Sequence, residues 1–183
     1  MIMVYVFLAD GFEEIEALTP VDLLRRAGVE VGTVSIYPDR KEVTGARNIC
    51  VKADLTIEEA DTANAELIVL PGGMPGTVNL LECKRLMDIV DAFNEKGGHV
   101  AAICAAPARI LGSKGLLKGK NATCYPGLEP LMEGATPVIK TVVTDGNITT
   151  SRGLGTAVDF ACELIALLCG EEKAKEIRTS VVA

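Results

Sequence analysis

The sequence predicts an α/β fold, a three-layer sandwich in which helices cover both faces of a mostly parallel sheet. Two observations lead to this class. Short apolar runs alternate along the chain with segments of helical periodicity, which is the order expected of βαβ units. The composition is aliphatic, with 4% aromatic residues and no tryptophan. Because 183 residues suffice for one such fold, we expect a single domain over residues 1–183.

Four apolar runs are predicted to be buried parallel strands. Each is almost continuous in apolar residues, as expected where both faces of a sheet are covered. The four runs are residues 2–8, 30–36, 66–73 and 99–104. Residues 141–151, "TVVTDGNITTS", are predicted to form a hairpin around an Asp-Gly turn.

Three segments have the features of helices. Residues 20–28 begin with Pro20, which suits a first helical turn, and end with Gly28, which suits the position just after a helix. Residues 83–98 space apolar side chains three and four apart and end in Gly-Gly. Residues 155–170 are predicted to form a longer, more buried helix.

Charge and cysteine usage exclude several classes of protein. With 18 basic and 25 acidic residues the formal net charge is −7, so nucleic acid is not expected as a partner. The first eight residues lack the basic flank and cleavage site of a signal peptide, and no apolar run reaches the ~20 residues of a membrane span. We therefore expect a cytoplasmic protein. The six cysteines contain no C-x-x-C pair, so we expect free thiols and no metal site.

Three stretches follow predicted strands and are expected to meet. In open α/β sheets, functional groups gather beyond the carboxyl ends of the strands. The stretches are residues 8–18 "LADGFEEIEAL", 70–77 "LPGGMPGT" and 102–111 "AICAAPARIL".

Cys104 is the first candidate within these stretches. An apolar strand, then Cys104, then a helical segment resembles the layout of a nucleophile elbow. A thiol at a helix N-terminus is favoured as a thiolate. The alternative is a packed core thiol, because free cysteine is among the most buried residue types. The pattern of residues alone leaves both interpretations open.

The partner of Cys104 is expected to be a carboxylate. The only histidine, His99, lies at the other end of the same strand, about 16 Å away at 3.3 Å per residue, and is expected on the surface. The acids near the site are Glu13, Glu14 and Glu16. A buried glutamate beside a thiolate would have a raised pKa and would donate its proton to the sulfur. Each of the three also fits a solvated acid at a helix start.

Main-chain amides complete the predicted site. Gly72 and Gly73 allow close approach of the backbone, and with the N–H of Ala105 they could form an oxyanion hole. A Pro-Gly-Gly sequence taken alone is also an ordinary turn.

The combination of these stretches resembles the ThiJ/PfpI superfamily. "LPGGMPGTVNL", "AAICAAPARIL" and "TSRGLGTAVDFA" are similar to the branch that holds the human parkinsonism-associated deglycase and its bacterial chaperone-like relatives. The resemblance covers essentially the whole chain. It implies a flavodoxin-like fold related to class I glutamine amidotransferases, a homodimer, and no cofactor.

The same resemblance assigns roles to individual residues. It implies that Cys104 is the reactive cysteine and Glu16 its protonated partner, with Gly73 and Ala105 lining the anion pocket. It places Arg26 and Arg47 near the pocket or the dimer interface, and gives Arg152 a more structural role. Two positions depart from the family.

Those departures bear on the reaction. Proteases and glyoxalase/chaperones elsewhere in the superfamily have histidine where this chain has Ala105, and the human branch member has histidine where it has Tyr125. Both changes argue against a protease or amidotransferase, although Tyr125 could still donate a hydrogen bond into the pocket.

The resemblance favours a protein that acts on reactive aldehydes in stress protection. The expected substrates are methylglyoxal or its early adducts with thiols and amines, in deglycase- or glyoxalase-type hydrolase or lyase chemistry. The alternative is an oxidative-stress sensor or redox-regulated chaperone that works through a Cys104 sulfinate. Thiazole biosynthesis is suggested by the family name only, since the sequence has no phosphate loop or nucleotide fingerprint.

Overall fold

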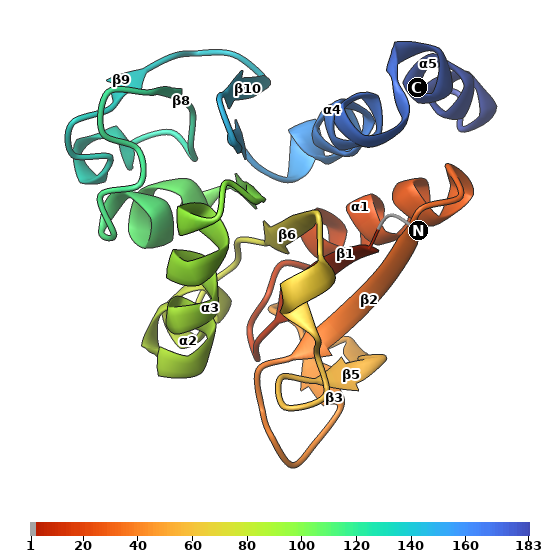
Figure 1. Ribbon diagram of the computed structural model, residues 1–183, viewed down its shortest axis with the longest axis vertical. Helices are drawn as coiled ribbons and strands as arrows, with labels where there is room; N and C mark the ends of the chain where they lie inside the picture. The colour runs from red at the N-terminus through yellow and green to blue at the C-terminus, as the bar shows by residue number, and fades with distance from the viewer. Residues whose placement is uncertain (1–2) are drawn as a thin grey trace.

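The computed structural model describes residues 3–183, and Figure 1 shows a sheet with helices on both of its sides. Within these residues the main sheet has seven strands, and every neighbouring pair except β10 with β11 is parallel. In spatial order the strands are β10 (Val142–Asp145), β11 (Ile148–Ser151), β7 (His99–Ile103), β6 (Leu67–Leu70), β1 (Met3–Leu8), β2 (Glu30–Ser35) and β5 (Leu55–Thr56). The predicted α/β class is confirmed. The start of the predicted strand at 2–8 lies outside the described residues.

Two apolar cores lie on the two faces of the sheet. Successive side chains of a strand point to opposite faces, so Val4 and Val6 of β1 enter one core while Tyr5 and Phe7 enter the other. The first core is closed by α1 (Glu14–Arg26), α4 (Ala157–Cys169) and α5 (Glu171–Ser180). The second is closed by α2 (Gly76–Glu82) and α3 (Lys84–Glu95).

Helix α1 begins earlier than the sequence analysis predicts. The side chain of Glu13 accepts a hydrogen bond from the amide of Glu16 and caps the helix there. Pro20 therefore lies inside the helix, and its placement in a first turn was wrong. A proline at this position removes one main-chain hydrogen bond of the helix, and the packing of the surrounding apolar residues keeps the helix intact. Gly28, with φ +83°, ends the helix as predicted.

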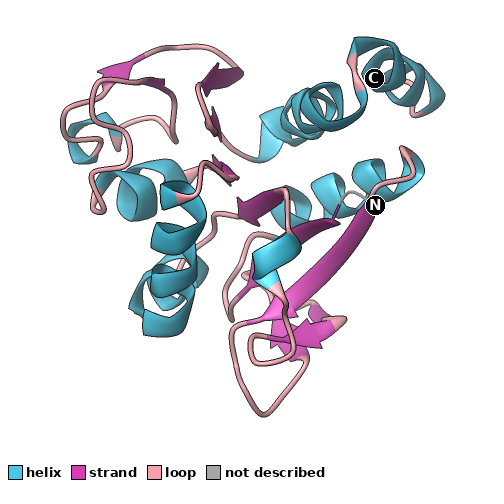
Figure 2. Cartoon of the chain, in the orientation of Figure 1, coloured by secondary structure: helices cyan, strands magenta, loops and turns pink. Residues whose placement is uncertain are grey.

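The other predicted elements are present and shorter elements join them. The helices predicted at 83–98 and 155–170 are α3 and α4, and the hairpin is β10–β11. Two small ribbons were not predicted: β3 (Glu42–Thr44) with β4 (Cys50–Lys52), and β8 (Asn121–Ala122) with β9 (Thr136–Pro137). The remaining short elements are η1 (Thr62–Asn64), η2 (Pro107–Gly112), η3 (Glu129–Leu131) and η4 (Leu154–Thr156). Figure 2 shows the loop between β2 and β3 extending past the end of β2.

The strand order places the site. β1 lies between β2 and β6. The chain therefore adds β2 and β5 on one side of β1 and then crosses to add β6 and β7 on its other side. Ligands bind beyond the carboxyl ends of the strands at such a switch point. The segments after β1, β6 and β7 meet there. Among the described residues, every helix is too short or too polar to span a lipid bilayer.

Candidate functional site

Cys104 lies on a sharp turn directly after β7. Its φ is +65°, a left-handed conformation that is uncommon for a residue other than glycine. Its amide donates to the carbonyl of Ser151 at 3.0 Å, and its carbonyl accepts from the amide of Tyr125 at 2.8 Å. These two hydrogen bonds hold a conformation that costs on the order of 1–3 kcal/mol. Cys104 thus lies on a sharp turn between β7 and the helical segment that follows it.

The residues after the turn bring main-chain donors to the sulfur. Ala105 and Ala106 are buried and small, which leaves room for the turn. They are followed by η2, a π-helix, a form that is often found at functional sites. The backbone amides of Ala105 and Gly73 face the Cys104 sulfur and act to lower the pKa of the thiol.

Glu16 is the acid that reaches this sulfur. It lies in the first turn of α1 and is 1% exposed. Its carboxyl group accepts from the amide of Gly72 at 3.1 Å, and the neighbouring Cys104 side chain and Leu154 backbone both act to lower its pKa. Glu14 is also buried, but it accepts from the amide of Arg47 at 2.7 Å.

Gly72 lies between Glu16 and Cys104. A Cβ atom at position 72 would lie 2.5 Å from the Glu16 Oε2 and 2.6 Å from the Cys104 Cβ. Glycine is therefore needed for the two side chains to meet across it. Its amide is used by Glu16. This corrects the expectation that the Gly72 amide lines the anion pocket with those of Gly73 and Ala105.

Burial and charge shift both ionisations. Burial, with a smaller contribution from the charge of Glu13, raises the pKa of Glu16 to about 7. Burial and the charge and hydrogen bond of Glu16 raise the pKa of Cys104 to about 12, which is opposite to the lowered value expected from the sequence. Protonation of Glu16 removes its charge and makes it a donor to the sulfur. The two groups thus titrate as a pair that shares a proton.

Tyr125 borders the same space. Tyr125 is 53% exposed, and its amide is hydrogen-bonded to the Cys104 carbonyl, which holds it next to the turn. A Cβ atom on Gly153 would lie 3.5 Å from the Tyr125 ring and 3.7 Å from the Glu16 Oε1. The ring and the carboxyl group therefore flank the same glycine.

The arginines lie farther from the sulfur. Arg26 is paired with Asp22 in the last turn of α1, about 15 Å along the helix from Glu16 at 1.5 Å per residue. Arg47 is anchored through its amide to Glu14, and its guanidinium donates to the carbonyl of Ala46. Arg152 lines a small cavity with the buried Cys124.

His99 begins β7 at the opposite end of the strand from Cys104, as predicted. It is partly buried rather than on the surface, and its Nε2 hydrogen-bonds to the Thr149 hydroxyl at 2.8 Å. Within residues 3–183, no three His, Cys, Asp or Glu side chains gather as a metal site.

The segment after β11 also contributes to the site, which the sequence did not reveal. The backbone of Leu154 in this segment acts to lower the pKa of Glu16. β11 runs parallel to β7, so its carboxyl end reaches the same edge of the sheet. This strand was interpreted only as an arm of a hairpin, and its end was not counted among those that meet.

Comparison with known proteins now bears on this arrangement. The sequence model described as the DJ-1/PfpI family matches residues 3–167. The chain belongs to the DJ-1/PfpI family. The resemblance inferred from the motifs is thereby confirmed.

Individual DJ-1/PfpI relatives resemble the chain over most of its length. Oxidized DJ-1 from Toxoplasma gondii has a structure with a TM-score of 0.95 and 36% identity, covering 100% of this chain and 98% of that one. Protein DJ-1 homolog B from Arabidopsis thaliana is 42% identical over 96% of this chain, which spans only 40% of that protein. A protein named deglycase from Pyrococcus abyssi is 36% identical, over 90% of this chain and 98% of its own length.

Proposed function

We propose that this DJ-1/PfpI protein is a cofactor-independent enzyme that uses Cys104 to act on reactive aldehydes, methylglyoxal or its early adducts with thiols and amines. One observation carries the proposal. Cys104 is held on a left-handed turn, and the missing side chain of Gly72 lets the buried Glu16 carboxyl group approach its sulfur, beside the backbone of Gly73 and Ala105. The name deglycase of a relative that is 36% identical supports the same class of reaction.

The proposed reaction needs no external oxidant. The Glu16 carboxylate takes the proton of the Cys104 thiol as the sulfur attacks the aldehyde carbon of methylglyoxal; a C–S bond forms, the C=O π bond opens, and Glu16 passes that proton to the carbonyl oxygen. The amides of Gly73 and Ala105 stabilise the charge that develops on that oxygen. Glu16 then moves the hydrogen of this carbon to the neighbouring carbon through an enediol, while the hydroxyl proton passes to the neighbouring oxygen, which gives a lactate thioester. Water hydrolyses the thioester, so methylglyoxal and water yield lactate and the free thiol.

The surroundings of Cys104 favour this chemistry over cleavage of amides. Ala105 and Tyr125 stand where related proteins have histidine, and His99 is at the far end of β7. The site therefore lacks an imidazole to protonate an amine leaving group. We assign the Tyr125 hydroxyl to substrate binding. The homodimer, with Arg26 and Arg47 at its interface, stays a prediction.

The test is the rate of lactate formation from methylglyoxal. We expect Cys104→Ala to abolish it and Glu16→Gln to lower kcat by about 10²- to 10⁴-fold, the usual contribution of a positioned acid–base group. Cys50→Ala is the matched control, because Cys50 is an exposed free thiol that could trap aldehydes nonspecifically. It should retain wild-type activity. Equal rates in all four proteins would refute the proposal.

A second candidate function is oxidation sensing at Cys104. The same amides and protonated Glu16 are donors suited to sulfinate oxygens, and the Toxoplasma relative is described as oxidized. Each peroxide molecule transfers one oxygen to the sulfur and leaves as water, so two peroxides convert the thiolate to sulfinate.

Mass spectrometry after mild peroxide treatment tests this candidate. We expect Cys104 to gain two oxygens before the other five cysteines are modified, although Cys50 is more exposed. Glu16→Gln removes the charge that raises the pKa of Cys104, so it should increase the thiolate fraction and speed the first oxidation step. Oxidation of Cys50 ahead of Cys104 would exclude a sensor role.

A further inference from the structure

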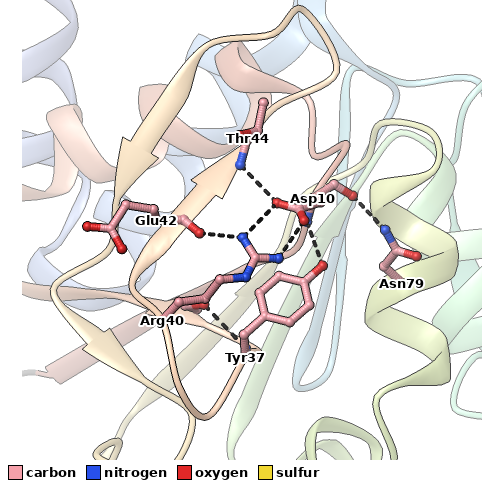
Figure 3. Close-up of polar contacts among 7 residues, drawn as sticks. Asp10, Tyr37, Arg40, Glu42, Thr44 and Asn79 are labelled. Atoms are coloured by element: carbon pink, nitrogen blue, oxygen red, sulfur yellow. Dashed lines mark hydrogen bonds and ion pairs between the residues drawn. The ribbon is translucent and has the colours of Figure 1, made fainter.

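Asp10 is the centre of a polar cluster that the catalytic proposal does not use. Figure 3 shows its carboxylate facing the guanidinium of Arg40, which stacks on the ring of Tyr37 with 3.7 Å between the Arg40 Cζ and the ring centre. The carboxylate also accepts from the amide of Thr44 at 3.0 Å. The Asp10 carbonyl accepts from the Asn79 side chain at 2.7 Å.

These contacts join three separate segments. Arg40 and Thr44 belong to the β2–β3 loop and β3, Asn79 belongs to α2, and Asp10 follows β1. The amide of Asp10 donates to the Tyr37 hydroxyl at 3.2 Å. Burial raises the pKa of Asp10, but the hydrogen bonds from Arg40 and Thr44 outweigh it and keep the pKa below its ordinary value. The carboxylate is therefore ionised and fully engaged at neutral pH.

The residues that follow Asp10 are held from both sides. On one side, Gly11 donates to the Thr44 carbonyl and Ala46 donates to the Phe12 carbonyl, each at 2.7 Å. Both contacts lie next to the hydrogen bond between Asp10 and Thr44. The Asp10 cluster thus fixes the β3 segment against which residues 11–12 are placed.

On the other side, residues 11–13 hold the turn that contains Gly72 and Gly73, which we call the glycine turn. Gly76 donates to the Gly11 carbonyl at 3.0 Å, and Glu13 donates to the Gly72 carbonyl at 2.9 Å. The Glu13 side chain caps α1 at the amide of Glu16. Residues 11–13 are therefore hydrogen-bonded both to the start of α1, which carries Glu16, and to the turn that carries Gly72.

We propose that Asp10, held by Arg40, is a positioning residue that sets the contact between Glu16 and Cys104. Its effect on turnover rests on the proposed function, whereas its effect on the reactivity of the thiol does not. Asp10 touches neither side chain and acts through residues 11–13. Its loss removes the ion pair with Arg40, which keeps the Glu42 carbonyl as an acceptor, and removes the acceptor of the Thr44 amide, so the β2–β3 loop is held less firmly against residues 11–12.

Asp54 offers a matched control. Like Asp10, it is a half-exposed carboxylate that accepts from a guanidinium, that of Arg25, and from a main-chain amide, that of Thr33. Arg25 lies in the last turn of α1, away from the glycine turn. Asp54→Asn should therefore cost comparable stability without reaching Cys104.

The experiment measures the alkylation of Cys104 by iodoacetamide as a function of pH, followed by mass spectrometry of the Cys104 peptide. We expect Asp10→Asn to move the midpoint of the profile by about half a pH unit or more toward the ordinary thiol value of about 8.5. Arg40→Gln, on the exposed loop, should do the same and serves if Asp10→Asn fails to fold. The double variant should shift no further than either single variant, because the two residues act as one unit. Arg40→Lys, which keeps the charge, should restore part of the wild-type profile.

Two outcomes would overturn the proposal. One is a wild-type profile in Asp10→Asn and Arg40→Gln, indistinguishable from that of Asp54→Asn, which would make the cluster merely structural. The other is a wild-type midpoint already at about 8.5, since Glu16 would then not influence the thiol. An absence of methylglyoxal turnover in the wild type would refute the proposed function alone and leave this reading of Asp10 to the alkylation profile.

Discussion

At the scale of single residues, the Glu16–Cys104 contact depends on the absence of a side chain at Gly72. The φ of Gly72 is not in the left-handed region, so alanine can adopt its backbone conformation. The obstacle is steric alone, because the added Cβ would lie 2.5 Å from the Glu16 Oε2 and 3.1 Å from the Cys104 Sγ. Glu16 must move if that atom is added.

We predict that Gly72→Ala lowers turnover of methylglyoxal by about tenfold or more, which corresponds to about 1.4 kcal/mol of lost transition-state stabilisation. Overpacking should also lower the free energy of unfolding by about 1–3 kcal/mol. Gly155→Ala is the control, since Gly155 has nothing within 4 Å of an added Cβ. Kinetics and urea unfolding of both variants check the prediction. Wild-type turnover in Gly72→Ala would contradict it.

The choice among the three glutamates shows what single residues reveal in a sequence. The pattern nominated Glu13, Glu14 and Glu16 equally, and only the family resemblance selected Glu16. In the structure Glu14 and Glu16 are both buried, at 4% and 1% exposure, but they point to different partners because residues two apart on a helix do not share a face. Because the sequence did not reveal where α1 begins, it did not show which of the three glutamates faces Cys104.

At the scale of elements, the sequence predicts best what is long and buried. The predicted strands are nearly continuous in apolar residues because they contribute to both cores, whereas α3 and α4 carry an apolar periodicity because each packs against one core. The start of α1 was missed because its cap is Glu13, which is not among the preferred capping residues, and because Pro20 suggested a later start.

The elements that the sequence did not reveal are those held by contacts far along the chain. Strands β3 and β4 have three residues each and are largely exposed, so they have no apolar pattern of their own. Their position depends on polar contacts such as the one between Asp10 and Thr44, residues 34 apart in sequence. Local composition and periodicity do not show which residues far apart in the sequence contact each other. The Asp10 cluster was invisible for the same reason, although it adjoins the predicted site.

At the scale of the whole molecule, two buried groups oppose each other in the pH dependence of stability. The pKa of Glu16 is raised by burial to about 7, so between about pH 4.5 and 7 the folded state holds a proton that the unfolded state has lost. Stability due to Glu16 therefore falls as pH rises through that range. The pKa of His99 is lowered, by burial and against the charge of Glu163. Below about pH 6.5 the unfolded state binds the extra proton instead, so stability due to His99 falls as pH decreases.

We predict that these two trends oppose each other in the wild type and that single substitutions separate them. Glu16→Gln should leave the contribution of His99, so the free energy of unfolding should rise with pH below about pH 6.5. His99→Gln should leave the contribution of Glu16, so it should fall by up to about 3 kcal/mol between about pH 4.5 and 7, at about 1.4 kcal/mol per pKa unit. His99 is the only histidine in the sequence, so no other imidazole contributes to the pH dependence of stability.

Urea unfolding followed by circular dichroism measures both slopes, since the chain has no tryptophan for fluorescence. Carboxylates with lowered pKa values, such as Asp10 and Asp54, act as pH falls toward 4 and contribute little above pH 5. His99→Gln retains a group that can hydrogen-bond the Thr149 hydroxyl, and this limits its effect on packing. If the free energy of unfolding depended on pH in the same way in the wild type and both variants, burial of Glu16 and His99 would not govern the pH dependence of stability.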